Sequence, residues 1–263
     1  MTDPRLRLDI DGAVARLTIA RPEKRNALDA AMVEALRAHC WTIERSPARV
    51  VLLTGEGDHS FCAGGDIAAW SGLSPDQFTR TWLRDGHDAF DALARLTQPV
   101  VALLNGDAFG GGLELAACAD ARIAEAHARF ALPESGLGII PGWSGTQRTV
   151  RRFGVQVVRR MALFGEVLTA EAALAAGIAD AVVPRGEGVA AANRLIERLT
   201  GRAPRATEFV KLLLNAAEGE ETERVLETLA GALAAGSAEL AEGLAAYRER
   251  RVPSFAQPAG EEA

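Results

Sequence analysis

The chain has 263 residues, of which 48% are apolar and 24% are charged, so it is long enough to bury a substantial core. Its formal net charge of −6 opposes general binding to nucleic acid, and its three cysteines lack the paired spacing of a disulfide framework or a cysteine-based zinc site. No segment resembles a secretory signal or a membrane span, so the sequence predicts a cytoplasmic protein that does not act on a membrane.

The first elements predicted along the chain are a β-hairpin and a helix. Residues 6–10 and 15–19 alternate apolar and polar side chains, and Asp11-Gly12 between them is a favoured two-residue turn. Asp29 is a suitable N-cap for the helix that follows, because the apolar residues after it recur at helical spacing. The chain therefore opens with an antiparallel pair of strands that leads into a helix.

Strands and helices then alternate up to about residue 150. Residues 49–54 and 100–104 are apolar runs typical of buried strands, and residues 74–77 form a capping box that predicts a helix start between them. This alternation indicates an α/β arrangement with parallel crossovers. Residues 155–250 are rich in Ala, Leu, Glu and Arg and are predicted to be helical.

Two glycine-containing loops carry the first indication of chemistry. They are residues 61–67 (FCAGGDI) and residues 105–114 (NGDAFGGGLE), and each follows an apolar strand. If each loop turns directly into a helix, its backbone N–H groups form a suitable cradle for an oxyanion. Either loop by itself is more simply explained as a tight turn, since neither has the phosphate-loop pattern.

Taken together, these loops resemble the hallmark segments of the crotonase (enoyl-CoA hydratase/isomerase) family, and the likeness is closest to enoyl-CoA hydratases. Residues 21–28 (RPEKRNAL) are similar to the family's R-P-x-x-x-N-A-L segment, and residues 61–66 to its F-x-A-G-x-D loop. The remaining matching segments follow in the family's order: Asn105-Gly106, the G-G-G-x-E of 110–114, the F-x-x-P-E of 130–134, Gly138, the P-G-x-x-G of 141–145 and the closing 242–255.

This resemblance implies the fold, the domain organisation and the assembly. The expected class is α/β, a crotonase-like spiral of ββα units with a C-terminal helical region. Residues 1–195 would form the spiral core, and residues 196–263 a helical region used in oligomerisation. The resemblance further implies a homotrimer or a homohexamer built from two trimers.

The resemblance also implies the site. Glu114 and Glu134 match the family's two catalytic carboxylates, and the backbone N–H groups of Gly65 and Gly111 match its oxyanion hole. The substrate would be an acyl-CoA thioester, so coenzyme A is part of the substrate and neither a separate cofactor nor a metal is implied. The residues expected to bind substrate or coenzyme A are Lys24, Arg25, Ala27, Ala63, Asp66, Ile67, Gly142 and Phe255.

The glutamate pair favours hydration of a 2-enoyl-CoA. One glutamate would take a proton from water as its oxygen attacks C3, while the other, or the proton just released, supplies C2. Two carboxylates beside one water in a dry pocket should not both ionise easily, so one pKa is expected to rise. Without the matching segments, Glu114 would be interpreted as an acidic residue favoured in the first turn of a helix by the helix dipole, and Glu134 as a solvated carboxylate in a loop.

Two other functions stay open at this point. A Δ3-Δ2 enoyl-CoA isomerase commonly needs only the glutamate matched by Glu134, and a noncatalytic crotonase-like binding protein needs neither. The segment that shapes the acyl pocket, residues 68–96, varies within the family, so a straight short-chain substrate is only a default. The side chains of Trp70, Trp82 and Trp143 would line that pocket or simply pack in the core.

Overall fold

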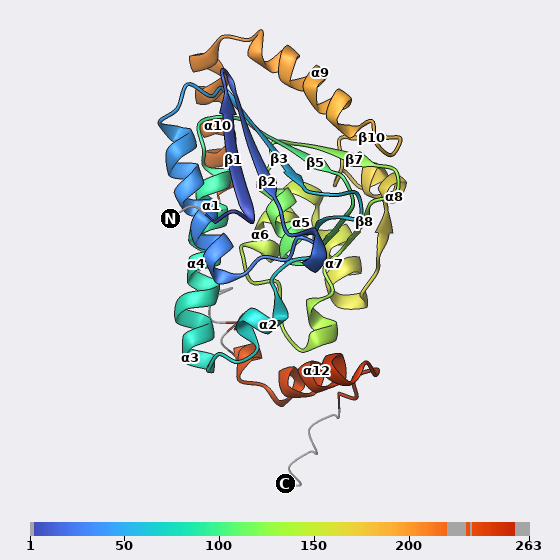
Figure 1. The fold of residues 1–263 in the computed structure, drawn as a ribbon. Helices are drawn as coiled ribbons and strands as arrows, with labels where there is room; N and C mark the ends of the chain where they lie inside the picture. The colour runs from blue at the N-terminus through green and yellow to red at the C-terminus, as the bar shows by residue number, and fades with distance from the viewer. Residues whose placement is uncertain (1–2, 220–229, 232, 256–263) are drawn as a thin grey trace.

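The computed structural model describes residues 3–219, 230–231 and 233–255, and this part of the chain is built around two β-sheets (Figure 1). The larger sheet has the strand order β1-β2-β3-β5-β7-β10, and the smaller has the order β4-β6-β8-β9. The strands are β1 Leu6–Asp11, β2 Val14–Ile19, β3 Val50–Gly55, β4 Ser60–Cys62, β5 Val100–Leu104, β6 Asp107–Phe109, β7 Ala121–Glu125, β8 Arg129–Ala131, β9 Leu168–Thr169 and β10 Ala181–Val183.

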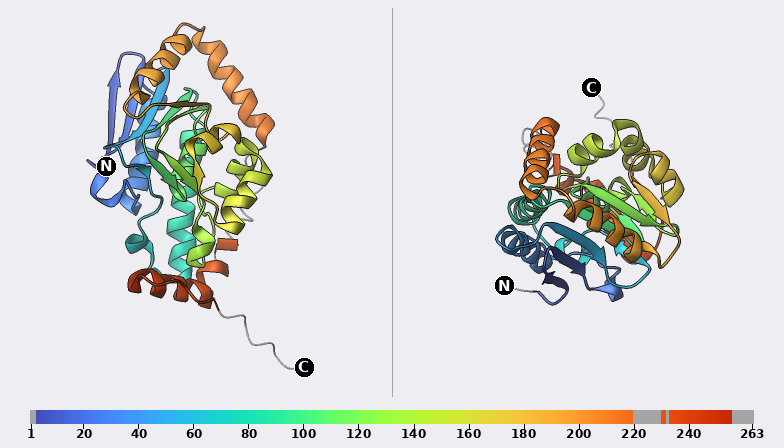
Figure 2. Two further views of the ribbon diagram at one scale, coloured as in Figure 1. Left: turned by 90° about the vertical axis from the view of Figure 1, so that its right-hand side faces the viewer. Right: turned by 90° about the horizontal axis from the view of Figure 1, so that it is seen from above.

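Helices cover the faces and both ends of these sheets (Figure 2). They include short 3-10 segments, η1 and η3, and one π-helical segment, η2. Their bounds are η1 Pro22–Lys24, α1 Ala30–Glu44, α2 Ile67–Trp70, α3 Pro75–Gln77, η2 Phe78–Leu83, α4 Arg84–Ala94, α5 Gly111–Ala117, η3 Glu134–Leu137, α6 Gly145–Phe153, α7 Val155–Phe164, α8 Ala170–Ala175, α9 Gly188–Thr200, α10 Pro204–Glu218 and α12 Ala238–Glu249.

The two sheets arise from repeated ββα units. β3, β5 and β7 are parallel neighbours in the larger sheet, and each continues into a short strand of the smaller sheet, respectively β4, β6 and β8. Those short strands are parallel neighbours as well. The expected spiral of ββα units is therefore confirmed.

The opening hairpin is confirmed, but its turn lies one residue later than predicted. Asp11 pairs with Val14, so the two loop residues are Gly12 and Ala13 rather than Asp11 and Gly12. Gly12 has a φ of +53°. A left-handed glycine at the first loop position is what a type II′ hairpin turn requires, and the strand register follows that requirement.

The long apolar runs are explained by burial of both faces of the larger sheet. Val51 and Leu53 face the main core, which contains residues of α1 and α4. Val50 and Leu52, on the opposite face, pack with residues of α9. Parallel strands covered on both sides read as continuous apolar segments, which is why residues 49–54 show no alternation.

The helical prediction for residues 155–250 is wrong at two places, where β9 and β10 occur. β9 pairs antiparallel with β8, and β10 extends the larger sheet by pairing parallel with β7. Strands of two and three residues carry too little periodicity to be recognised from sequence. Within the described residues, no helix has both the length and the apolar character needed to cross a membrane.

The C-terminal helices lie at opposite ends of the molecule (Figure 1). α10 is attached to the core by Lys211, whose buried ammonium lies 2.7 Å from an Asp120 carboxylate oxygen and donates a 2.9 Å hydrogen bond to the Gln98 carbonyl. α12 packs instead against η3. The division into a core of residues 1–195 and an oligomerisation region of residues 196–263 stays a prediction, and residues 220–229, 232 and 256–263 of the second region lie outside the described part.

Candidate active site

The site forms where three parallel strands of the smaller sheet end side by side. β4 is followed by Ala63-Gly64-Gly65, β6 by Gly110 and α5, and β8 by Leu132-Pro133 and η3. Parallel neighbours present their carboxyl ends at the same edge, which is where α/β sheets commonly bind ligands. The strands that precede the glycine loops are thus β4 and β6, which are too short for the sequence pattern to reveal.

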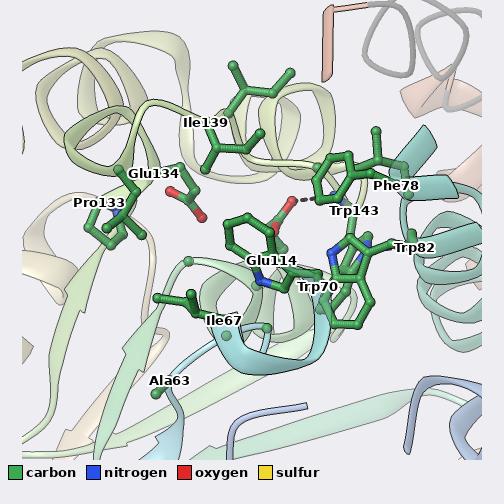
Figure 3. A pocket seen from close by; sticks show the side chains of 18 residues that line it. Ala63, Ile67, Trp70, Phe78, Trp82, Glu114, Pro133, Glu134, Ile139 and Trp143 are labelled. Carbon is green, nitrogen blue, oxygen red and sulfur yellow. Dashed lines mark hydrogen bonds between the residues drawn. The ribbon is translucent and has the colours of Figure 1, made fainter. Parts of the chain in front are cut away.

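A cavity of about 110 Å³ opens at this edge (Figure 3). It brings together most of the residues predicted to act on the substrate. The predicted residues that line it are Ala63, Gly65, Ile67, Gly111, Glu114, Glu134 and Gly142.

The two glycine loops touch backbone to backbone beside this cavity. Gly64 has a φ of +95°, and a Cβ at this position would lie 3.0 Å from the Gly111 nitrogen. Gly111 is the first residue of α5, so its N–H has no acceptor within the helix. Gly65 lines the same cavity, and the fold therefore places both predicted N–H donors at one wall.

Glu114 reaches this wall from the first turn of α5. Its side chain is buried, and its Oε1 accepts a 2.8 Å hydrogen bond from the backbone N–H of Trp143. A Cβ on Gly145 would overlap the same oxygen. The carboxylate is therefore confined between α5 and the turn at residues 142–145, which limits it to a narrow range of orientations.

Glu134 approaches from the opposite side of the cavity, at the start of η3. Figure 3 shows the two carboxylates facing one another across the cavity. The Glu134 carboxylate lies over the start of α5, because a Cβ on Gly110 would be 2.7 Å from its Oε1. α12 supports η3 from behind, where Gly243 packs against the Leu137 backbone so closely that a side chain would not fit.

A buried polar cluster holds the turn that contacts Glu114. The Ser144 hydroxyl lies 2.9 Å from His87 Nδ1 and donates a 3.3 Å hydrogen bond to Asp91 Oδ1. Asp91 Oδ1 also accepts a 2.7 Å bond from Arg148 Nη2. All four side chains are buried. His87 is contributed by α4 and packs inside this cluster.

Loss of the Asp91 charge is expected to destabilise the fold strongly. Asp91→Asn leaves the buried guanidinium of Arg148 with less compensating charge, and breaking a buried ion pair from one side costs about 3–5 kcal/mol. Urea unfolding of the variant measures this loss. The matched control is Asp76→Asn, which breaks the exposed pair with Arg80 and should cost less than about 1 kcal/mol. Equal losses in the two variants would contradict the interpretation.

The segment predicted to meet coenzyme A lies beside the first glycine loop. The Arg25 carbonyl accepts a 3.0 Å hydrogen bond from Ala63 N–H, and Leu28 N–H donates to the Gly64 carbonyl at 2.8 Å. Lys24 and Arg25 have exposed side chains, whereas Ala27 is buried. The two cations are therefore close to the loop in the fold without lining the cavity.

Asp66 and Phe255 lie outside the cavity lining as well. The Asp66 carboxylate pairs with Arg21 at 2.9 Å and accepts a 3.1 Å hydrogen bond from Ala68 N–H, so it caps α2. Phe255 is exposed near the end of the described chain. The contacts of Asp66 are those of a residue that shapes the loop.

Cys62 is the cysteine nearest to this chemistry, and it is unsuited to act as a nucleophile. Its thiol is fully buried, and this burial, with a smaller contribution from the charge of Glu114, raises its pKa to about 12. A backbone hydrogen bond from Gly64 opposes the rise only in part. The thiol stays protonated at neutral pH, so Glu114 and Glu134 are left as the groups in the described cavity lining that can exchange protons.

Part of the site was not recognised in the sequence. Trp70, Trp82 and Trp143, for which the sequence left pocket lining and core packing open, line the cavity and are buried. The other apolar lining residues are distant along the chain and, apart from Pro133, belong to no motif that reveals them. They are Phe78, Leu83, Pro133, Leu137, Ile139 and Ile140.

Comparison with known proteins agrees with this geometry. A family model described as Enoyl-CoA hydratase/isomerase matches residues 9–258. The chain is 32% identical to a crotonyl-CoA hydratase of Syntrophomonas wolfei over 251 residues, covering 94% of this chain and 96% of that protein. It is 35% identical to a short-chain-enoyl-CoA hydratase of Clostridium acetobutylicum over 209 residues, 79% of this chain and 80% of that protein.

Solved structures show the same likeness in three dimensions. A carnitinyl-CoA hydratase from Mycobacterium avium superposes with a TM-score of 0.84 at 32% identity, covering 97% of this chain and 99% of that one. An enoyl-CoA hydratase/isomerase from Pseudoalteromonas atlantica superposes with a TM-score of 0.86 at 29% identity, covering 96% of this chain and 100% of that one. The chain belongs to the enoyl-CoA hydratase/isomerase (crotonase) family.

Proposed function

We propose that this protein is an enoyl-CoA hydratase, a hydro-lyase that adds water across the 2,3-double bond of a 2-enoyl-CoA thioester. The observation that carries the proposal is the pair of carboxylates, Glu114 and Glu134, that face one another across a cavity with Gly65 and Gly111 in its wall. The relatives named as crotonyl-CoA and short-chain-enoyl-CoA hydratases support the same reaction.

The two glycine N–H groups would stabilise the charge that develops on the substrate. When a nucleophile adds to C3, the thioester becomes an enolate whose negative charge rests largely on the carbonyl oxygen. Two N–H donors held in place by packed backbone need no rearrangement to receive that charge, and each is worth about 3–4 kcal/mol in comparable sites. The touching loops at Gly64 and Gly111 provide this rigidity.

The carboxylates would divide the proton transfers. We assign the base to Glu114, since the N–H that Trp143 donates stabilises a carboxylate, and the acid to Glu134. Glu114 takes one proton from water, the hydroxide oxygen bonds to C3, and Glu134 delivers a proton to C2. A proton that passes back from Glu114 to Glu134 restores both groups, so the reaction consumes only water and requires no separate cofactor.

The decisive experiment follows the conjugated-thioester absorbance of crotonyl-CoA after the purified protein is added. A hydratase removes this absorbance and forms 3-hydroxybutyryl-CoA. If the absorbance stays constant while a 3-enoyl-CoA is converted to the conjugated 2-enoyl-CoA, the protein is an isomerase. A protein that binds no CoA thioester at all would contradict both activities and favour a noncatalytic role.

We also propose that the protein assembles as a homotrimer or as a pair of trimers in the cytoplasm. Large apolar side chains exposed on α7, on α10 and just after α7 support association, because surfaces of this kind commonly mark subunit contacts. Sedimentation equilibrium would give the mass, and a monomer at micromolar concentration would contradict the proposal. These exposed residues are Leu163, Phe164, Val167, Phe209, Val210, Leu213 and Leu214.

A further inference from the structure

One side of the cavity is closed by aromatic rings, here named the indole wall and consisting of Trp70, Phe78, Trp82 and Trp143. Figure 3 shows these rings on the Glu114 side of the cavity, with Pro133 and Glu134 on the other. The three indoles and the phenyl ring come from α2, from the π-helical segment η2 and from the turn before α6. All four are buried although they line the cavity.

Trp143 occupies the space beside both oxyanion glycines. A Cβ on Gly111 would lie 3.0 Å from the Trp143 ring, and a Cβ on Gly65 would lie 3.3 Å from it. A carbonyl oxygen bound between these glycines therefore has the indole of Trp143 as its neighbour. Glycine at both positions leaves room for the Trp143 ring and for the substrate carbonyl, since a side chain at either position would crowd the ring.

The Trp143 ring is also fixed in place. Its Nε1 donates a 3.1 Å hydrogen bond to the Trp82 carbonyl, and its ring centroid lies 4.9 Å from that of Trp82 and 5.0 Å from that of Phe90. On α4, Gly86 leaves the room that the indole fills, because a Cβ there would overlap the ring. A ring held on several sides cannot swing aside without disrupting η2 and α4.

The orientation of the substrate follows from charge. The diphosphate of coenzyme A requires cations and solvent, and the exposed Lys24 and Arg25 lie beside the loop that contains Ala63. In the proposed reaction the thioester would lie at the glycines, with C2 and C3 between the glutamates. The carbon atoms beyond C3 would then extend away from Ala63 and toward the indole wall, where apolar atoms are preferred.

The size and charge of the cavity restrict what these carbon atoms can be. Its volume of about 110 Å³ is well below the roughly 300–1,000 Å³ of pockets that hold drug-sized ligands. Glu114, a carboxylate in its proposed role as the base, would repel a carboxylate on the acyl chain. In an aromatic cage that binds a cation, the ring faces surround an open space. The rings of Trp82 and Trp143 pack on one another instead, so they do not form such a cage for a cationic acyl group.

We propose that the indole wall limits the substrate to short, uncharged acyl groups, and that Trp143 is its principal specificity-determining residue. This inference rests on the proposed enoyl-CoA hydratase function. A four-carbon substrate adds only one carbon beyond C3 to this small cavity, whereas each further methylene has to displace an indole that is held by the Trp82 carbonyl and by Phe90.

The test compares straight-chain 2-enoyl-CoA thioesters of four, six, eight and ten carbons. The wild-type kcat/KM should be highest for the four-carbon substrate and at least about tenfold lower for eight carbons. Trp143→Leu keeps an apolar side chain but removes the ring, and should shift the ratio of the two kcat/KM values by at least about tenfold toward eight carbons. Trp41→Leu, at an exposed tryptophan of α1, is the matched control and should leave the ratio unchanged.

A binding measurement separates this inference from the hydratase proposal. Saturated acyl-CoA thioesters of the same lengths bind without reacting. Their Kd values therefore measure how the indole wall affects affinity for each chain length, even if no substrate is hydrated. The inference is supported if the wild type binds butyryl-CoA more tightly than octanoyl-CoA and if Trp143→Leu abolishes or reverses this preference. This holds whether or not the protein hydrates enoyl-CoA. Equal wild-type affinities, an unchanged ratio in the variant, or a preference for a trimethylammonio-butenoyl-CoA would overturn it.

Discussion

Glu134→Gln is expected to lower kcat for crotonyl-CoA by at least about 100-fold while CoA-thioester affinity changes less than about threefold. The amide keeps the shape of the carboxyl group but cannot deliver the proton to C2. Glu114→Gln should cause a comparable loss, because an amide cannot accept a proton from water. Stopped-flow absorbance gives kcat, and titration calorimetry with butyryl-CoA gives the affinity.

The control for these variants is Glu34→Gln, at an exposed glutamate on α1. It changes the net charge by the same amount and should leave kcat within about twofold, as surface changes generally do. Wild-type turnover in Glu134→Gln would remove Glu134 from the mechanism. A loss in Glu134→Gln alone, with Glu114→Gln fully active on crotonyl-CoA, would remove Glu114 from the mechanism and leave the proton transfers of hydration to a single glutamate.

Gly145→Ala is expected to lower kcat by about 100-fold although both glutamates are retained. The added Cβ would overlap Oε1 of Glu114, so the carboxylate must move away from the position set by the Trp143 N–H. A displacement of about 1 Å in a catalytic group can cost this much. Gly145 is the first residue of α6, where alanine is otherwise favourable, so the helix itself should not be weakened.

The matched control for this variant is Gly72→Ala. A Cβ at Gly72 meets no atom within 4 Å, so the substitution should leave kcat unchanged. Circular dichroism and the affinity for butyryl-CoA would show that Gly145→Ala still folds and binds. Undiminished kcat in a folded Gly145→Ala protein would mean that the turn at residues 142–145 does not orient Glu114.

The residues of the matching segments divide into those that shape the site and those that face the substrate. Asn26 is fully buried, and its side-chain amide donates to the Glu56 and Ser60 carbonyls at 3.0 and 2.7 Å. Asn105 donates in the same way to the Gly55 carbonyl at 2.8 Å. Both amides bind the backbone of loops near the site, which accounts for their presence in motifs without any chemical role.

Much of the fold was predictable because its signals are local. The cap at Asp29 and the capping box at Ser74 and Gln77 occur as predicted, since each depends on residues within one helical turn. The apolar strand at residues 100–104 is confirmed to the residue. β9 and β10 were missed because very short strands depend on their partners in the sheet rather than on their own pattern.

The sequence by itself determined the family and the α/β class, and it predicted the two glutamates and the glycine loops as the candidate site, because these rest on co-linear segments of a few residues each. Only the tertiary structure decided what surrounds them. The hydrogen bond from Trp143 to Trp82 joins residues 61 positions apart, and that from Arg148 to Asp91 spans 57. A periodic pattern shows that a side chain is buried but not which distant residue covers it, so the indole wall and the cluster behind Glu114 emerged only from the packing of α4 against the start of α6.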